Sequence, residues 1–428
     1  MATFNWRNVD LNVSLTRRAR LYAAVSGAFI LTFLVGLYYQ LDADSRFGSY
    51  SYPASEAIHD AIVRPWLPEV KPRVLLVSAF FPLPKSKHTF GEYEAWLTHY
   101  LQPITSDLYM FAPPEMEEMI RRLRGDLPMT LNTTYNTIWD IPTLQGRKDL
   151  YYEMHTWDPE QWLHSPELYA VWTGKVFFLD EGFTNSLAAG KHCDYAFWND
   201  AGSMRESHTY KNWPDGRRVD EVFRASAKLS GVPIEQMVFF GLWWAPNKDH
   251  KESKEWQEER GPVEWMMSEG SFFGGMLDAV RTYRHLYMAY HDHYLARSFF
   301  VGKDQSIMNV LLFLFPSHFT VTWIYDSIAR EEMGIPDGAE TQLGNCGSSW
   351  FYYQWYFAEE TEREAQADAW YAEVDAHRAG GEPVKERCHM QRLMTFDMFM
   401  KRAYGNDWVP PPASVDIVGE GLRWLDHP

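Results

Sequence analysis

The first part of the chain alternates strand-like apolar runs with helical spacing. Residues 74–81 form a continuous apolar run of strand length, which is typical of a strand covered on both faces. Residues 92–101 then place apolar side chains at helical spacing, and residues 108–111 form a second short apolar run. This β-α-β opening predicts an α/β fold with a parallel sheet.

The same alternation continues along the rest of the chain. Ser165 and Pro166 predict a helix start, with serine as the cap and proline at the first helical position. The further predicted elements are strands at residues 195–198, 237–240 and 319–324, a helix whose buried face carries Val280, Tyr283, Tyr287, Tyr290 and Tyr294, and an apolar helix at 306–315. The Gly-rich stretch at 269–275 reads as a loop between them.

The N-terminal region predicts a membrane anchor. Residues 21–39 are uncharged and long enough to cross a bilayer, with arginines before them and aspartates after them. The positive-inside rule makes residues 1–20 a cytoplasmic tail and places the rest of the chain in a lumen. A cleaved signal peptide is the competing interpretation, but no small-x-small cleavage site follows the segment. Residues 40–70 are expected to be a stem, 71–345 the main domain and 346–428 a helical and aromatic extension packed on it.

Composition indicates which ligands, disulfides and modifications the chain can have. The net charge of −17 argues against broad nucleic-acid binding, and the 46% hydrophobic content supplies a substantial core. The cysteines Cys193, Cys346 and Cys388 allow at most one internal disulfide, with Cys346–Cys388 and three unpaired thiols as open alternatives. Asn132 lies in a glycosylation sequon on the expected lumenal side.

Asp200 is the first candidate for ligand chemistry. It follows an apolar strand, and parallel α/β sheets place ligands at the carboxyl ends of their strands. The small residues Ala201 and Gly202 after it let a ligand approach the backbone. The carboxylate suits a divalent cation or sugar hydroxyls, and a local Asx turn is the alternative.

Two further acids lie near predicted elements. Asp304 and Gln305 begin the apolar helix, where an N-cap role for the aspartate competes with a catalytic one. Glu269 is a candidate base or hydroxyl acceptor, with a solvated loop acid as the alternative. A metal site at His291 and His293 is disfavoured, because helical residues two apart face away from each other.

Five pieces in order resemble the HtrL/YibB-like glycosyltransferase family, and they span residues 73–325. The pieces are residues 74–81 with 92–101, residues 168–172 leading to Lys175, residues 195–202 with Arg205, residues 269–275, and Asp304-Gln305 with the downstream Phe315-Pro316. The resemblance implies a GT-A-like nucleotide-sugar-binding fold with a central, mostly parallel twisted sheet.

The resemblance also implies roles for site residues. Those implied to bind the donor are Asp200, Asn199, Gly202, Arg205 and Lys175, and Gly270, Gly274 and Gly275 lie on the acceptor side. Asp304, Gln305 and Glu269 are the catalytic candidates. In such enzymes an Asp-x-Asp segment holds Mn²⁺ or Mg²⁺; here residues 198–200 occupy its place with the first acid absent, which leaves Asp200 as the one metal ligand.

The resulting expectation is a type II membrane glycosyltransferase of the Golgi or ER. It would move a sugar from a nucleotide-sugar donor to a glycan or glycoprotein acceptor. A catalytically silent lumenal glycan-binding or scaffold protein with the same fold is the alternative. A glycoside hydrolase with Asp200 and Glu269 as its carboxylate pair is a third class, and no motif supports it.

Overall fold

The computed structural model describes residues 71–246, 255–326, 349–377, 390–418 and 421–425. The chain divides into two compact units, Met1–Val70 and Lys71–Pro428, and every described residue belongs to the second. The expected tail, anchor and stem, together with Cys346 and Cys388, lie outside the described residues. Within the described ranges no helix has the length and apolarity that a membrane span requires.

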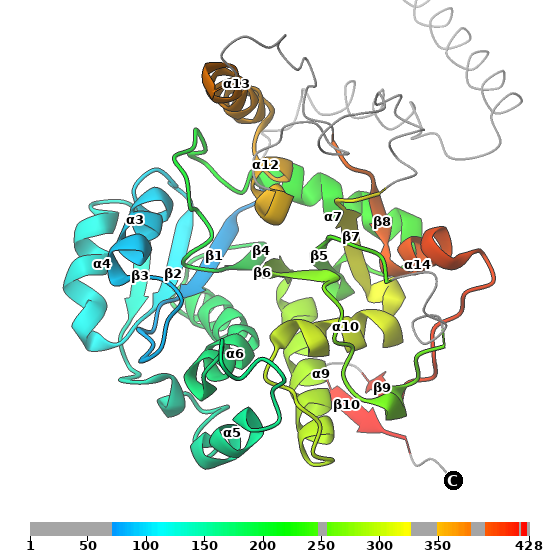
Figure 1. The fold of residues 1–428 in the computed structure, drawn as a ribbon. Helices are drawn as coiled ribbons and strands as arrows, with labels where there is room; N and C mark the ends of the chain where they lie inside the picture. Colours follow the sequence, from blue (N-terminus) through cyan, green and yellow to red (C-terminus); the bar gives the residue numbers. More distant parts are fainter. Residues whose placement is uncertain (1–70, 247–254, 327–348, 378–389, 419–420, 426–428) are drawn as a thin grey trace, which may run out of the picture. The chain divides into compact units, whose positions relative to one another are not determined.

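A large mixed sheet forms the centre of the second unit (Figure 1). Its order is β3-β2-β1-β4-β6-β5-β7-β8. The pairs β3–β2, β2–β1, β1–β4 and β5–β7 are parallel, while β4–β6, β6–β5 and β7–β8 are antiparallel. The strands are β1 Val74–Ala79, β2 Asp107–Phe111, β3 Met129–Asn132, β4 Tyr195–Asn199, β5 Val238–Leu242, β6 Ser268–Gly275, β7 Phe319–Trp323 and β8 Leu393–Thr395. The α/β prediction is therefore confirmed, with a sheet that is parallel in four of these seven pairings.

Helices cover both faces of the sheet (Figure 1). One face packs against α6 Pro166–Ala188, α9 Leu277–Leu295 and α10 Asp304–Leu314. The other face packs against α3 Phe90–Leu101, α7 Gly216–Ser230 and α12 Tyr352–Tyr356. The other α-helices within the described residues are α4 Glu117–Arg124, α5 Lys148–His155, α13 Glu360–His377 and α14 Phe396–Tyr404. Short 3-10 helices are η2 Pro114–Met116, η3 Ile138–Asp140, η4 Ile234–Gln236, η5 Glu258–Arg260, η6 Pro316–His318 and η7 Ser349–Phe351.

Strand alternation explains how β4 serves both layers. Ala196 and Trp198 join the core beneath α6 and α9, whereas Tyr195 and Phe197 join the core on the α7 side. All four side chains are buried, as expected for an inner strand covered on both faces. The residue after this strand therefore lies at the junction of two packed layers.

The start of α6 follows the predicted signal. The Ser165 hydroxyl accepts a hydrogen bond from the Leu168 N–H at 3.3 Å, and Pro166 occupies the first turn. The cap satisfies an N–H group that would have no partner within the helix, and proline has no N–H to satisfy. This helix then carries Lys175 into the interior.

The Gly-rich stretch is a strand, and the prediction of a loop is wrong. All eight residues of β6, Ser268–Gly275, are buried between β4 and β5. A Cβ on Gly274 would lie 2.1 Å from the Ala196 carbonyl oxygen, and one on Gly275 would lie 2.4 Å from that of Met237. These glycines permit close approach of neighbouring backbones, which is a recognised use of glycine within a strand.

The C-terminal part completes the sheet. Strand β8 pairs with β7, and Phe396 and Phe399 of α14 are fully buried in the core. A separate antiparallel hairpin contains β9 Val415–Val418 and β10 Gly421–Trp424. The segment expected as an extension thus contributes an edge strand of the main sheet.

Candidate active site at the carboxyl edge of the sheet

Two carboxylates from distant parts of the chain meet one ammonium group. Lys175 Nζ on α6 lies 3.1 Å from Asp200 Oδ1, just after β4, and 2.9 Å from Asp304 Oδ2, at the start of α10. The same Nζ donates to the Gly270 carbonyl oxygen of β6 at 2.9 Å. An ammonium group has three N–H donors, so these three acceptors match its full capacity.

Lys175, Asp200 and Asp304 are called the Lys175 group, and their charges affect one another's pKa values. The side chains of Lys175 and Asp304 are 4% and 6% exposed. Burial alone would lower the pKa of Lys175, but the charges of Asp200 and Asp304 raise that pKa above its usual value. Burial raises the pKa of Asp304, and the positive charge of Lys175 opposes that rise. The lysine is therefore the fixed positive charge of the site.

Asp200 is the carboxylate of this group that reaches solvent. Its side chain is 34% exposed, and its Oδ1 accepts a hydrogen bond from Trp198 Nε1 at 2.5 Å. The Asp200 N–H donates to the Ser271 carbonyl oxygen at 2.9 Å, which extends the β4–β6 pairing by one residue. The carboxylate is thereby oriented by two buried neighbours while one side stays open to a ligand.

Asp304 combines an ion pair with a contact inside its helix. Lys303, which precedes α10, makes no side-chain cap. Asp304 Oδ1 accepts from the Gln305 N–H at 2.9 Å, and the other oxygen faces Lys175. Gln305 Nε2 donates to the Ser268 carbonyl oxygen at 2.6 Å, which ties the helix start to β6. Helix capping alone therefore does not account for Asp304.

Glu269 lies beneath the surface, so the alternative of a solvated loop acid is wrong. Its Oε1 accepts from the Ser271 N–H at 2.9 Å and from the Ser271 hydroxyl at 2.5 Å. Burial raises the pKa of Glu269 to about 8, against the effect of these hydrogen bonds. The carboxyl group is therefore mostly protonated at neutral pH, which disfavours Glu269 as a general base.

The predicted acceptor-side glycines separate into two kinds. Gly270 lies inside the site, since a Cβ there would contact Asp304 Oδ2 and Gln305 Cγ, each at 3.3 Å. Gly274 and Gly275 lie further along β6, where close strand approach explains them. Gly202 lies against α3, and its Cβ would be 3.1 Å from the Trp96 ring.

Asn199 faces the opposite side of the strand end from Asp200. It is fully buried, and its Oδ1 accepts from the Ser203 hydroxyl at 3.2 Å. The structure thus brings Asp200 to the ligand-facing side but not Asn199. Ser203, Ser271 and Tyr353 complete this polar network, and the pattern of the sequence did not indicate them; the Ser271 and Tyr353 hydroxyls lie 3.1 Å apart.

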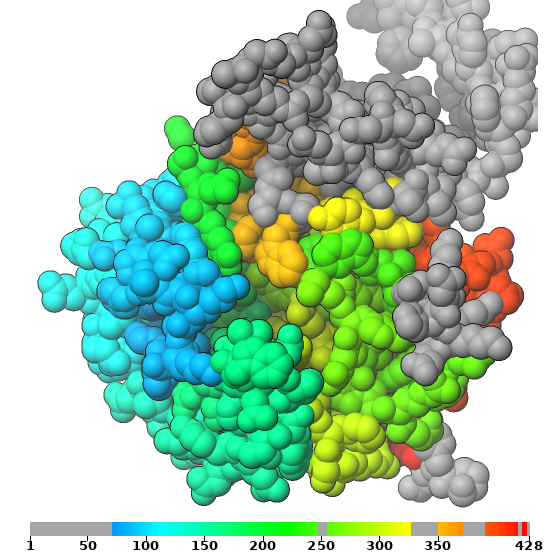
Figure 2. Space-filling view, in the orientation of Figure 1, coloured from blue at the N-terminus to red at the C-terminus, as the bar shows by residue number. Residues whose placement is uncertain are grey.

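Arg205 lies on the same loop as Asp200 but outside the Lys175 group. Its guanidinium lies over the Trp96 ring at 4.6 Å and the Phe351 ring at 5.4 Å. It lines a cleft of about 610 Å³ between this loop and helices α12 and α13. In Figure 2 the blue, green and orange parts of the chain, to which the cleft-lining residues belong, adjoin one another.

The residues around Asp200 do not by themselves form a divalent-cation site. Asp200 is the one solvent-facing carboxylate of its group, and the Lys175 ammonium lies between it and Asp304. Hard cations such as Mn²⁺ and Mg²⁺ require several oxygen ligands, which in protein sites come from carboxylates, water and substrate phosphates. Asp200 therefore offers one protein ligand, and Lys175 already supplies positive charge there.

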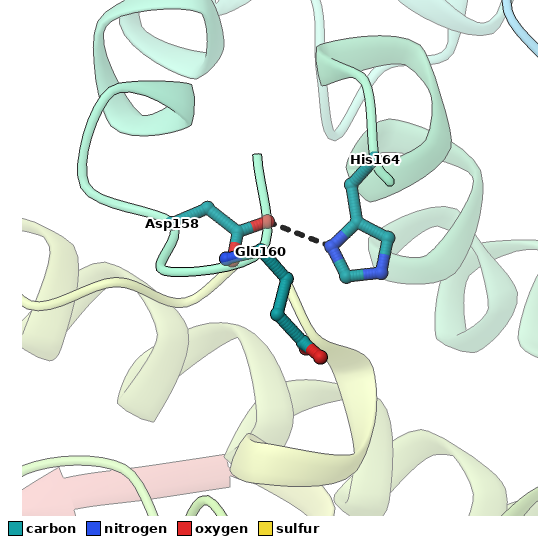
Figure 3. Close-up of side chains that lie close together, drawn as sticks. All are labelled: Asp158, Glu160 and His164. Carbon is teal, nitrogen blue, oxygen red and sulfur yellow. Dashed lines mark hydrogen bonds and ion pairs between the residues drawn. The ribbon is translucent and has the colours of Figure 1, made fainter. Parts of the chain in front are cut away.

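Another acidic group lies at residues 158–164 (Figure 3). Asp158, Glu160 and His164 each place one potential ligand atom within 4.8 Å of the others. Asp158 Oδ2 lies 2.7 Å from His164 Nδ1 and accepts from the Tyr169 hydroxyl at 2.6 Å, while Glu160 pairs with Lys303. Burial tends to raise the pKa of Asp158, but hydrogen bonds from Tyr169, the Glu160 N–H and His164 lower it. These partners satisfy the group without an ion.

The His291-Asp292-His293 segment also has protein partners. The buried His291 ring contacts the Tyr151 hydroxyl at 3.0 Å and Asp292 at 2.9 Å. Asp292 pairs with Arg147, and His293 stacks on Trp424. The two histidines have separate surroundings, as the helical spacing predicted.

Comparison with known proteins gives distant structural matches. No family model matches the chain, and neither does any curated protein. Core-mannan synthase A from Aspergillus fumigatus, in an Mn/GDP form, has 14% identity and a TM-score of 0.35, over 61% of this chain and 74% of that one. The mannosyltransferase Ktr4p from S. cerevisiae has 14% identity and a TM-score of 0.33, over 60% and 69%. Mouse xyloside xylosyltransferase 1 has 12% identity and a TM-score of 0.30, over 58% and 84%. These neighbours are glycosyltransferases, but at such scores they assign neither a family nor an activity to this chain.

Proposed function

We propose that the chain is a glycosyltransferase that uses a nucleotide-sugar donor, with its reaction centre at Lys175, Asp200 and Asp304. The observation that carries this proposal is the convergence of the two carboxylates on one buried ammonium at the carboxyl edge of the sheet. Ligand sites of α/β proteins are concentrated at such edges, especially where the strand order changes direction. Here the order changes beside β4, the strand that Asp200 follows.

The proposed reaction transfers a glycosyl group to a hydroxyl. The acceptor oxygen bonds to the anomeric carbon, and the bond from that carbon to the nucleoside diphosphate breaks with its electron pair on the leaving oxygen. The hydroxyl proton passes to a carboxylate, for which Asp200 is accessible while Glu269 is already protonated at neutral pH. The fixed charge of Lys175 favours the negative charge that develops on the leaving group.

Asp304 and Gln305 have a positioning role in this proposal. Asp304 holds Lys175 from the α10 side, and Gln305 joins the helix start to β6. Gly270 leaves room beside both side chains. The donor-binding set then contains Asp200, Lys175 and the small residue Gly202, whereas the buried Asn199 supports the strand end.

The proposal also covers the family, the cellular location and the acceptor. The fold is GT-A-like and related to the HtrL/YibB-like glycosyltransferases, as the five ordered sequence pieces suggest. Residues 21–39 anchor the chain as a type II protein of the Golgi or ER, with residues 71–428 in the lumen. The acceptor is a glycan or glycoprotein. No step of the reaction is assigned to Mn²⁺ or Mg²⁺.

A thermal-shift screen of the full chain against nucleotide sugars, with and without Mn²⁺, tests the proposal. Stabilisation by one donor is expected, because a ligand that binds only the folded state raises its apparent stability. A catalytically silent glycan-binding protein is the second candidate, and the saturated hydrogen bonding of Lys175 favours it. Stabilisation by glycans but by none of the nucleotide sugars would favour that candidate.

A further inference from the structure

The cleft beside Arg205 is distinct from the Lys175 group. Segments from three regions line it: the loop before α3, the loop after β4, and the helical segments η7, α12 and α13. Its volume of about 610 Å³ falls in the range of small-molecule sites. The lining residues that could contact a ligand include Lys87, Arg205, Trp350, Phe351 and Trp370.

The cleft carries positive charge in an acidic protein. Lys87 and Arg205 are both exposed, and among the described residues neither forms an ion pair. Glu206 is the one acid in the lining. Burial lowers the pKa of His208 to about 4, so this histidine is neutral at physiological pH. In a chain of net charge −17, two cations in one cleft that pair with no acid among the described residues favour an anionic ligand.

Aromatic rings form the walls of the same cleft. Trp350 is 41% exposed and stacks on Trp243 with their ring centroids 3.7 Å apart. Trp370 and Phe351 are partly exposed, and Arg205 lies over the Phe351 ring. Exposed rings held by packing offer flat apolar faces on which a ligand ring can lie with little loss of side-chain entropy.

Polar groups at the base of the cleft have unused hydrogen-bonding capacity. The Tyr210 hydroxyl and His208 Nδ1 are buried without a hydrogen-bond partner in the part of the chain that the structure describes. Tyr210 is only 1% exposed. Both atoms are inaccessible to solvent, so they belong to the packed wall of the cleft and make no direct contact with a ligand.

The cleft is joined to the candidate reaction centre through a short loop. The Ser203 N–H donates to the Asp200 carbonyl oxygen at 3.0 Å, and Gln354 Nε2 donates to the Ser203 carbonyl oxygen at 3.0 Å. Asp200 and the cleft-lining Ser203 and Arg205 therefore belong to one fixed turn. The Asp200 side chain does not line the cleft, so this turn is the link between the cleft and the candidate reaction centre.

We propose that this cleft is the acceptor subsite and that it binds an acidic glycan, whose carboxylate, sulfate or phosphate group meets Arg205 and Lys87 while its sugar rings lie on Trp350 and Trp370. The proposal rests on the glycosyltransferase function above and specifies its acceptor class.

Calorimetric titration of the full chain in detergent tests this assignment. The probes are a disaccharide that contains glucuronic acid and the same disaccharide with its carboxylate reduced to an alcohol. The acidic form is expected to bind at least about tenfold more tightly, as one charge-assisted hydrogen bond contributes a factor of this order. Arg205→Gln should abolish that preference and leave binding of the neutral form unchanged, whereas Trp350→Ala should weaken both forms alike. Arg122→Gln, at an exposed site on α4, is the matched control and should bind both forms as wild type does.

Two results would overturn the assignment. One is equal binding of the acidic and neutral disaccharides to the wild-type chain. The other is Arg205-dependent binding of UDP or GDP without binding of either disaccharide, which would make the cleft a nucleotide site. A chain that binds the acidic disaccharide but no nucleotide sugar would contradict the proposed transferase function while supporting the cleft assignment, so the two failures are distinguishable.

Discussion

Lys175 Nζ lies 2.9 Å from Asp304 Oδ2, although 129 positions separate the two residues in the sequence. Both side chains are almost fully buried, and each compensates the other's charge. Removal of one partner from a buried ion pair leaves an uncompensated charge, which typically costs about 3–5 kcal/mol. The folded structure therefore requires both charges of this pair to be present together.

Lys175→Met should lower the free energy of unfolding by about 3 kcal/mol or more. Adding Asp304→Asn should restore part of that loss, with a coupling energy of roughly 1 kcal/mol or more in a double-mutant cycle by denaturant unfolding. Lys401→Met removes a much more exposed pair with Asp397 and should cost at most about 1 kcal/mol. Strictly additive effects of the first two substitutions would show that the Lys175–Asp304 contact carries no energy.

The elevated pKa of Glu269 predicts a pH dependence of stability. The pKa of Glu269 is about 8 in the folded chain, against an ordinary value of 4.5. Between these two pH values the carboxyl group is protonated in the folded state and ionised in the unfolded state. This stabilisation is fully present below about pH 4.5 and is lost as pH rises through 8. Glu269→Gln cannot titrate, so the stability of wild type relative to this variant should fall as pH rises from 5 to about 8.

Denaturant midpoints measured across that pH range provide the test. Glu115→Gln, at an exposed position of η2, is the control for loss of a surface carboxylate. A pH-independent difference between wild type and Glu269→Gln would show that Glu269 is not the titrating group.

The glycines of β6 should respond differently to alanine. Gly274→Ala places a Cβ 2.1 Å from a carbonyl oxygen, so it should destabilise the fold by about 3 kcal/mol or more. Gly270→Ala meets side-chain atoms at 3.3 Å and should cost less stability while it weakens donor binding. Unfolding midpoints and donor-dependent thermal shifts measure the two effects. The opposite ranking in stability would mean that β6 is not held as closely between β4 and β5 as described.

The strands and helices with strong apolar patterns could be predicted from sequence, and β6 could not. The runs that became β1, β2, β4, β5 and β7 were visible because inner strands of such sheets are continuously apolar. Strand β6 carries glycines where adjacent backbones meet, and glycine ordinarily argues against a strand. Local propensity contains no information about that tertiary requirement.

The candidate site was likewise predictable only in part. Asp200 and Asp304 stood out by their places after a strand and at a helix start, and Lys175 was implied only by the family resemblance. Their contact depends on packing of α6 against β4 and α10. Strand alternation could have separated the buried Asn199 from Asp200. Trp198, Ser271 and Tyr353 gave no signal, because aromatic and hydroxyl residues are common in such a core.

Asn132 tests the expected topology. It ends β3, and its Nδ2 donates to the Tyr109 hydroxyl at 3.2 Å. A glycan is expected there in a eukaryotic host, since the amide nitrogen has two hydrogens and glycosylation replaces one of them. Asn12 also lies in a sequon, but within the predicted cytoplasmic tail, where no glycan is expected. Glycosidase treatment should therefore shift the mobility of wild type and of Asn12→Gln, but not of Asn132→Gln. An unglycosylated Asn132 would count against a lumenal domain.

The consumption of nucleotide sugars by wild type and Asp200→Asn tests the central claim most directly. The substitution keeps the size of a side chain that is 34% exposed and removes its charge, so the chain should stay folded by circular dichroism. The account predicts that wild type releases nucleoside diphosphate from at least one donor and that Asp200→Asn does so at least about 100-fold more slowly. Equal turnover by the two proteins, or the absence of turnover with every nucleotide sugar in the presence of glycan acceptors, would contradict a glycosyltransferase centred on Asp200.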